Sequence, residues 1–206
     1  MKVLDAGCGR ECVLVDIPED AYVVGIDLDR DALALNSRVN EIIVGDVQSY
    51  PLPDQEFDAV VCINVLEHLP DPKAALANMT RALKPGGTMN LGLPNLISPK
   101  GIVTKFTPLR FHVWVYRRFY KMQEAGSPGH PPYKTYHRWV IRPAGLRKLA
   151  PRLGLEVLSS EIYASGRIRA LFEEHRLLNT IVRALWPGDP MLTECRMTLR
   201  RVDGGA

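Results

Sequence analysis

The chain has 206 residues, a formal net charge of +3 and a hydrophobic content of 46%, values typical of one globular domain with a substantial core. It contains no run of eighteen apolar residues and no long apolar stretch after Lys2, so we expect neither a transmembrane helix nor a signal peptide. Its four cysteines form no CxxC pair, which predicts reduced thiols and a cytoplasmic location.

Positive charge is concentrated in one segment of the chain. Residues 99–142 contain nine Lys or Arg residues and one acid, Glu124, and therefore carry +8, while the remainder carries −5. Such an asymmetry concerns the partners of a protein rather than its fold.

The first apolar run leads into two glycines. Val3–Ala6 predicts a buried parallel strand, and Gly7 and Gly9 let the backbone turn tightly and approach a ligand with no Cβ in the way. A short helix over Arg10–Val15 would direct its free N–H groups at the same ligand. The stretch predicts the strand–loop–helix crevice that holds a nucleotide cofactor in a doubly wound sheet.

Strand and helix alternate as far as residue 93. The alternation predicts an α/β fold, a doubly wound, Rossmann-like sheet that is mostly parallel and has helices on both faces. The predicted elements are strands over Tyr22–Asp27, Glu41–Asp46, Phe57–Ile63 and Thr88–Leu93, and helices over Arg30–Arg38 and Lys73–Leu83.

The pattern changes after residue 93. Residues 94–142 are rich in Pro, Gly, aromatic and basic residues and are too long for a plain loop, so we expect an insertion that covers the substrate within a single domain spanning residues 1–206. The aromatic and basic residues between Lys105 and Lys121 predict a helix packed on the core, an apolar or anionic substrate pocket, or contact with a membrane surface. Nucleic acid ranks last because no RNA-binding motif is present. The remaining predicted elements are two helices and two strands, the last of which suits an antiparallel edge strand: Pro143–Arg152, Leu155–Tyr163, Arg167–Trp186 and Leu192–Arg201.

Three acids lie at or near the ends of the first three predicted strands: Asp5, Asp27 and Asp46. Parallel strands bring these ends to one edge of the sheet, where the carboxylates can converge on one crevice. Asp27 lies eighteen residues past Gly9, a spacing at which an acid accepts hydrogen bonds from ribose hydroxyls. Because so many carboxylates would repel a pyrophosphate, they favour a cationic nucleoside without phosphates.

Five motifs carry a family resemblance. In chain order they are Val-Leu-Asp-Ala-Gly-Cys-Gly, Val-Val-Gly-Ile-Asp-Leu-Asp, Gly-Asp-Val, Phe-Asp-Ala-Val-Val-Cys-Ile-Asn-Val-Leu-Glu-His-Leu and Leu-Lys-Pro-Gly-Gly. Over about residues 2–93 the chain resembles the class I S-adenosylmethionine-dependent methyltransferases, most closely the small-molecule, methyltransferase type 11-like branch. The resemblance implies S-adenosylmethionine as cofactor, S-adenosylhomocysteine as product, and methyl transfer to an O, N or C nucleophile of a small molecule. The insertion suggests an apolar, lipid-like or anionic acceptor.

The same resemblance assigns cofactor contacts to eight residues. They are Asp5, Gly7, Gly9 and Asn64 around the methionine moiety, Asp27 at the ribose hydroxyls, and Leu28, Asp46 and the Val47 backbone at the adenine.

His68 belongs to a Glu-His pair that often follows the fourth strand in this branch. It is the candidate general base, because an imidazole pKa lies near neutrality, and it equally suits a structural role. His112, His130 and His137 are rival bases. We expect no metal site, since adjacent residues such as Glu67 and His68 seldom point the same way.

Two features depart from the family pattern. Glu11 stands where many members have a third glycine, and the helices that usually precede the first strand are not in this sequence. We therefore expect an open cofactor pocket, a cover supplied by the insertion or by the second subunit of a homodimer, or a misassigned gene start.

Two other functional classes stay open. A non-methylating member of the same fold, a cyclase or an assembly partner, would have kept or lost cofactor binding. A nicotinamide-dependent oxidoreductase would bind NAD instead, although Asp5 and Asp46 argue against it.

Overall fold

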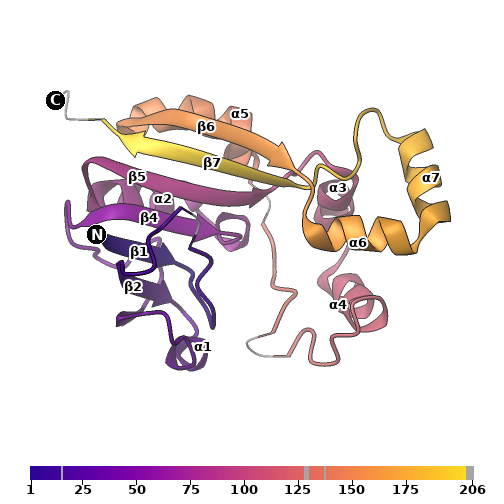
Figure 1. Cartoon of the computed structure of the whole chain (residues 1–206), viewed down its shortest axis with the longest axis horizontal. Helices are drawn as coiled ribbons and strands as arrows, with labels where there is room; N and C mark the ends of the chain where they lie inside the picture. The colour runs from indigo at the N-terminus through magenta and orange to yellow at the C-terminus, as the bar shows by residue number, and fades with distance from the viewer. Residues whose placement is uncertain (15, 128–129, 137, 203–206) are drawn as a thin grey trace.

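The computed structural model describes residues 1–14, 16–127, 130–136 and 138–202 of the chain. Its strands form one seven-stranded sheet in the order β3-β2-β1-β4-β5-β7-β6 (Figure 1). Neighbouring strands from β3 to β5 are parallel, and β7 pairs antiparallel with β5 and with β6. The expected fold class is therefore confirmed. The strands are β1 (Lys2–Ala6), β2 (Tyr22–Asp27), β3 (Glu41–Val44), β4 (Phe57–Ile63), β5 (Leu83–Pro94), β6 (Leu155–Tyr163) and β7 (Glu194–Arg201).

Helices pack around this sheet and extend beyond one end of it. In Figure 1, α2 and α5 lie behind the sheet, while α3, α4, α6 and α7 gather beyond the carboxyl ends of β4 and β5. Within the described residues, no helix combines the length and the apolarity that crossing a membrane requires. The helices are α1 (Arg30–Ala34), α2 (Pro72–Ala82), α3 (Pro99–Phe106), α4 (Leu109–Arg118), α5 (Pro143–Leu149), α6 (Gly166–Glu174) and α7 (Arg176–Leu185), with 3₁₀ turns η1 (Leu66–His68), η2 (Trp139–Ile141) and η3 (Ala150–Leu153).

The main core lies between the sheet and the helices α2 and α5. α2 begins at Pro72, behind the side chain of Asp71, which accepts hydrogen bonds from two N–H groups of the first turn. Its residues Leu76 and Met79 are fully buried against the sheet. Burial of this apolar face holds the parallel strands in register, so their carboxyl ends line up at one edge.

Two of the predicted helices in the N-terminal part are wrong in extent or place. The predicted helix Arg10–Val15 does not form in residues 10–14, and α1 ends at Ala34 instead of Arg38. Both differences trace to Asn36, whose side-chain amide donates to the carbonyl oxygens of Cys8 and Gly9. The Gly9 carbonyl would be the first acceptor of a helix that starts at Arg10, and here it accepts from the Asn36 side chain.

The C-terminal elements differ from prediction as well. The predicted helix over Arg167–Trp186 is two helices, α6 and α7, which meet at His175. The last strand, β7, is not an edge strand, because it lies between β5 and β6 with Met197 fully buried. The edge is β6, where Leu158 and Ile162 are exposed.

The internal position of β7 predicts the cost of truncating its side chains. Leu199 on β7 is 1% exposed and Leu158 on the neighbouring β6 is 48% exposed. We expect Leu199→Ala to lower the free energy of unfolding in urea by about 2–5 kcal/mol. The matched change Leu158→Ala should cost under about 1 kcal/mol. Equal losses in the two variants would show that β7 is not the buried strand.

Candidate functional site

The crevice begins where β1 turns into the glycine loop. Gly7 has a φ of +77°, and a Cβ at this position would lie 2.3 Å from Cγ2 of Val65, which follows β4. Gly7 is therefore required both for its backbone conformation and for the close approach of the chain after β4. Gly9 has a φ of +50°, and a Cβ there would meet no atom within 4 Å. The loop thus presents an open face at Gly9.

Asp27 at the end of β2 fixes this loop. Its Oδ2 accepts a hydrogen bond from the Gly9 N–H at 2.9 Å, and its Oδ1 accepts one from the Asp29 N–H at 2.9 Å. The Asp29 side chain in turn caps α1 by accepting from the Ala32 N–H. Sequence reasoning placed Asp27 at this edge, and the structure adds that its carboxylate also orders the backbone of the loop.

Asp5 lies in β1 directly behind the loop and is almost fully buried. Its Oδ2 has no hydrogen-bond partner among the described residues. Burial is the main cause that raises the pKa of this carboxyl to about 6, the nearby charge of Asp27 raises it further, and a hydrogen bond from the Cys12 thiol opposes the rise. A buried acceptor without a partner beside a second carboxylate is a site that a cation would stabilise.

The other side of the crevice is formed by the residues after β2 and β3. Leu28 is 68% exposed, so its apolar side chain is available to a ligand. Both carboxylate oxygens of Asp46 accept from the Gln48 side chain, and Oδ1 also accepts from the Gln48 N–H. Val47 is buried, and its carbonyl accepts from the Asn78 side chain. Asp46 and Val47 therefore form an ordered turn at the edge next to Asp27.

Beyond β4 the chain turns sharply into η1. Asn64 is exposed and holds a φ of +57°, an uncommon conformation for a residue other than glycine. Its N–H donates to the Gly92 carbonyl of β5 at 2.9 Å, which fixes the turn. Because β4 pairs with β1, this turn lies across the glycine loop from Asp27.

The neighbouring side chains Glu67 and His68 are both neutral at pH 7. Glu67 is buried and its Oε2 has no hydrogen-bond partner among the described residues, and burial raises the pKa of this carboxyl to about 8. Burial also lowers the pKa of His68 below its usual value, partly offset by a hydrogen bond to the Lys134 carbonyl. The 3.9 Å between Glu67 Oε1 and His68 Nε2 is therefore a contact between neutral groups.

A short strap from the insertion, residues 133–136, determines the tautomer of His68. The Nδ1 of His68 lies 2.8 Å from the Lys134 carbonyl oxygen. A carbonyl can only accept, so Nδ1 carries the proton and Nε2 keeps the lone pair of a base. The strap is held to η1 by a second bond, from the Tyr136 N–H to the Glu67 carbonyl.

Tyr133 in the strap is a site residue that sequence reasoning missed. Its ring packs edge-on to His68 with the ring centroids 5.8 Å apart. Burial, followed by the charges of Asp29 and Asp27, raises the pKa of its phenol. The aromatic-rich composition of the insertion was the one sequence signal, and it did not single out this residue.

The rival histidines lie elsewhere. His112 contacts the Thr107 side chain and carbonyl, His130 lies 3.2 Å from a Glu124 carboxylate oxygen, and His137 is outside the described residues. In the described part of the chain, no three His, Cys, Asp or Glu side chains gather as metal ligands would.

Comparison with known proteins finds a family match in the N-terminal part of the chain. Residues 4–91 match the sequence model of the methyltransferase domain. That match covers less than half of the chain, and it supports the resemblance to the class I S-adenosylmethionine-dependent methyltransferases. Relatives that match the same part of the chain are named O-methyltransferases, and a solved structure that shares the fold is named a SAM-dependent methyltransferase.

Three relatives illustrate the similarity. The ubiquinone biosynthesis O-methyltransferase of Idiomarina loihiensis is 40% identical over 96 residues, which is 42% of this chain and 39% of the relative, so the match spans about two fifths of that protein. A solved SAM-dependent methyltransferase from Archaeoglobus fulgidus is 18% identical with a TM-score of 0.58 and covers 97% of this chain and 85% of its own. The [4+2]-cyclase SpnF is also 18% identical, with a TM-score of 0.57 over 98% of this chain and 76% of its own. At these identities the two solved structures share the fold alone.

The buried carboxyl of Glu67 predicts a pH-dependent stability. Its pKa is higher in the folded state than in the unfolded state. The contribution of Glu67 to the free energy of unfolding is therefore fully present below the unfolded pKa of about 4.5 and is lost as pH rises through about 8. Glu67→Gln cannot ionise. The difference between its free energy of unfolding and that of the wild type should therefore rise in favour of the variant by about 2–4 kcal/mol from about pH 5 to about pH 9. Urea unfolding at the two pH values measures the difference.

An exposed glutamate supplies the control for that measurement. Glu161 on β6 is exposed, and Glu161→Gln should follow the wild type at both pH values. A Glu67→Gln variant that also follows the wild type would show that Glu67 is ionised in the folded protein at neutral pH.

Proposed function

We propose that this protein transfers a methyl group from S-adenosylmethionine to a small-molecule acceptor, with His68 as the general base. The observation that carries the proposal is the buried carboxylate of Asp5, which has an unpartnered oxygen and lies behind the open glycine loop. A cationic ligand at that edge would supply the missing partner. S-adenosylmethionine carries its ammonium and sulfonium charges without any phosphate, which suits an edge lined with acids.

The crevice residues fit this cofactor in the roles that the family resemblance assigns. Asp5, Gly7, Gly9 and Asn64 would border the methionine moiety, and Asp27 would accept from the ribose hydroxyls. Leu28, Asp46 and the Val47 backbone would lie at the adenine. The carboxylate of Asp27 already has two backbone donors, and each carboxylate oxygen has a further lone pair for a hydroxyl.

The chemistry needs little from the protein beyond position and one proton transfer. When bound, the cofactor supplies an electrophilic methyl group on a good leaving group. The chain holds donor and acceptor in line and keeps water out. His68 Nε2 takes the proton of an acceptor hydroxyl, because Nδ1 is held protonated against the Lys134 carbonyl. The lowered pKa of His68 keeps this nitrogen unprotonated at neutral pH.

The acceptor is assigned by class only. The insertion, residues 94–142, supplies the strap beside His68 and is the proposed cover of the substrate. Its aromatic side chains and +8 net charge over residues 99–142 favour an acceptor that is apolar, lipid-like or anionic. A relative named for ubiquinone biosynthesis is consistent with an apolar acceptor. All four cysteines are unpaired, which supports a cytoplasmic location.

A second candidate function is a non-methylating activity on the same fold. One solved structure that shares the fold is named a [4+2]-cyclase. Glu11 in place of the third loop glycine also favours this alternative. It predicts no methylated product even where the cofactor binds.

Replacing Asp27 tests the cofactor site. We expect calorimetry to show binding of S-adenosylhomocysteine and none of NAD, and Asp27→Ala to weaken that binding roughly tenfold or more, the scale of a charge-assisted hydrogen bond of about 1.5–3 kcal/mol. Asp31→Ala, at an exposed position in α1, is the matched control and should bind normally. Unchanged affinity in Asp27→Ala would remove this residue from the site, and preference for NAD would favour an oxidoreductase.

Replacing His68 tests the base. His68→Ala should lower turnover about 10²-fold or more while S-adenosylhomocysteine binds with unchanged affinity. His112→Ala removes a histidine bonded within the insertion and should keep the wild-type rate. The rate of the wild type should fall only below about pH 6.5, since the folded pKa of His68 is lowered. A His68→Ala enzyme of normal rate would leave the histidine a structural role.

A further inference from the structure

Helix α4 is only partly covered by the rest of the described chain. It has no buried residue, whereas α2 buries six of its eleven residues. Of the alternatives that the sequence left open, packing of the aromatic side chains on the core is therefore not favoured. Trp114 is 54% exposed and Phe119, at the end of the helix, is 47% exposed. Apolar rings left in water on this scale mark an interaction surface.

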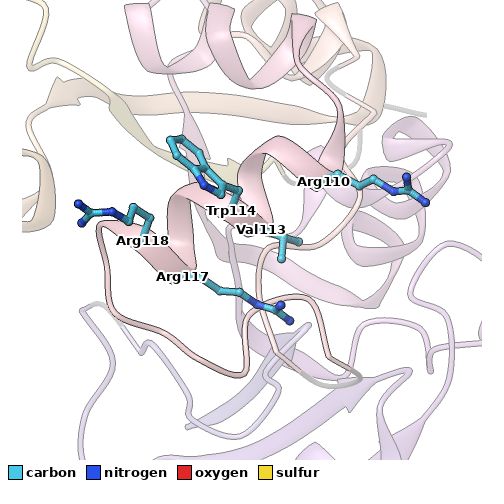
Figure 2. Close-up of a pocket in the computed structure, with 5 residues that line it drawn as sticks. All are labelled: Arg110, Val113, Trp114, Arg117 and Arg118. Carbon is cyan, nitrogen blue, oxygen red and sulfur yellow. The ribbon is translucent and has the colours of Figure 1, made fainter.

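The exposed rings form one cluster. The ring of Trp114 lies 5.8 Å from that of Phe111 and 5.7 Å from that of Phe119, between centroids. Arg110 and Arg118 flank the cluster along the helix, and Figure 2 shows their side chains extending away from each other at the two ends. We call these five residues the aromatic–arginine face.

The charge around this face has one sign. Residues 99–121 contain six Lys or Arg residues and no acid. Three of these bases are engaged elsewhere, Lys100 with Glu194, Lys105 over the ring of Trp139, and Arg117 with the Ala125 carbonyl. Neither Arg110 nor Arg118 forms an ion pair with a carboxylate of the described residues. Both guanidinium groups are available to an anionic partner.

Further apolar side chains are exposed at the same end of the molecule. Phe106 of α3 is 76% exposed. On α7, Leu177, Ile181 and Leu185 recur every fourth residue and are 76%, 47% and 78% exposed. Figure 1 shows α3, α4 and α7 beyond the carboxyl ends of the parallel strands, the end at which the crevice opens.

We propose that the aromatic–arginine face docks this protein on an anionic phospholipid bilayer. Tryptophan and phenylalanine partition into the headgroup region, while arginine pairs with phosphate and with anionic headgroups. Docking in this way brings the crevice to the lipid surface. The proposal goes beyond the proposed function, because docking requires neither cofactor nor acceptor.

Two other occupants fit the face less well. Single-stranded nucleic acid stacks on free aromatic faces, whereas the ring of Trp114 is already packed between those of Phe111 and Phe119. A second copy on a two-fold axis would face the same patch, and its Arg110 and Arg118 would meet like charges. A bilayer with anionic lipids satisfies both the rings and the guanidinium groups.

Vesicle co-sedimentation of the full chain, with no cofactor added, tests the docking. We expect binding to vesicles of equimolar phosphatidylcholine and phosphatidylglycerol to exceed binding to pure phosphatidylcholine by about tenfold or more, and to weaken steeply as salt rises. The double variant Arg110→Gln, Arg118→Gln should lose about tenfold or more in partitioning, and Trp114→Ala should lose a similar factor.

A charge-matched variant separates docking at this face from general attraction. Lys148 and Arg152 are exposed bases on α5 and η3, and the double variant Lys148→Gln, Arg152→Gln should bind vesicles as the wild type does. Wild-type protein that stays in the supernatant, or equal losses in the two double variants, would overturn the proposal. So would a dimer in light scattering that Trp114→Ala dissociates, or an oligonucleotide that displaces the protein from the vesicles.

Discussion

The two hydrogen bonds accepted by Asp27 are the constraint on which the crevice depends. One carboxylate at the end of β2 holds the Gly9 N–H on one side and the Asp29 N–H on the other. Asp29 caps α1, and just beyond that helix Asn36 returns to the carbonyls of Cys8 and Gly9. The glycine loop is thus closed into a ring of polar contacts and keeps its shape without a helix behind it.

The same edge of the sheet carries an electrostatic cost. Asp5 is buried next to Asp27, and burial together with that neighbouring charge raises the pKa of Asp5 to about 6. An unpartnered oxygen in such a place is costly to the folded protein. A cation against the loop would lower this cost, which is the physical reason that the proposed ligand is cationic.

The sequence predicted the strands of the sheet better than the segments that connect them. The bounds of β2, β4 and β6 agree with the predicted ranges. β2 and β4 are mostly apolar runs between turn residues, which is the pattern of a buried strand. The expected fold class follows from the alternation of strand and helix. The helix after Gly9 failed because the side chain of Asn36, 27 residues away, takes the carbonyl of Gly9. A local sequence pattern cannot predict a hydrogen bond from a side chain so far along the chain.

The same limit applies to the candidate site. Strand ends placed Asp5, Asp27 and Asp46 at one edge, since register in a parallel sheet follows from the order of its strands. The tautomer of His68 depends on a carbonyl 66 residues away, and a backbone carbonyl leaves no mark in the sequence. The sequence did not predict the burial of Glu67 either. Glu67 and His68 lie in the 3₁₀ turn η1, where the alternation of buried and exposed residues along β4 no longer applies.

The insertion contributes a backbone contact to the candidate site. The strap can bond to His68 only while Nδ1 carries the proton, because the Lys134 carbonyl cannot donate. A strap lifted from η1 would free the imidazole to take either tautomer, and with the proton on Nε2 that nitrogen could no longer accept one. The segment that carries the aromatic–arginine face thus also sets the state of the candidate base. The position of the strap against η1 and the basicity of His68 Nε2 are therefore coupled through one hydrogen bond.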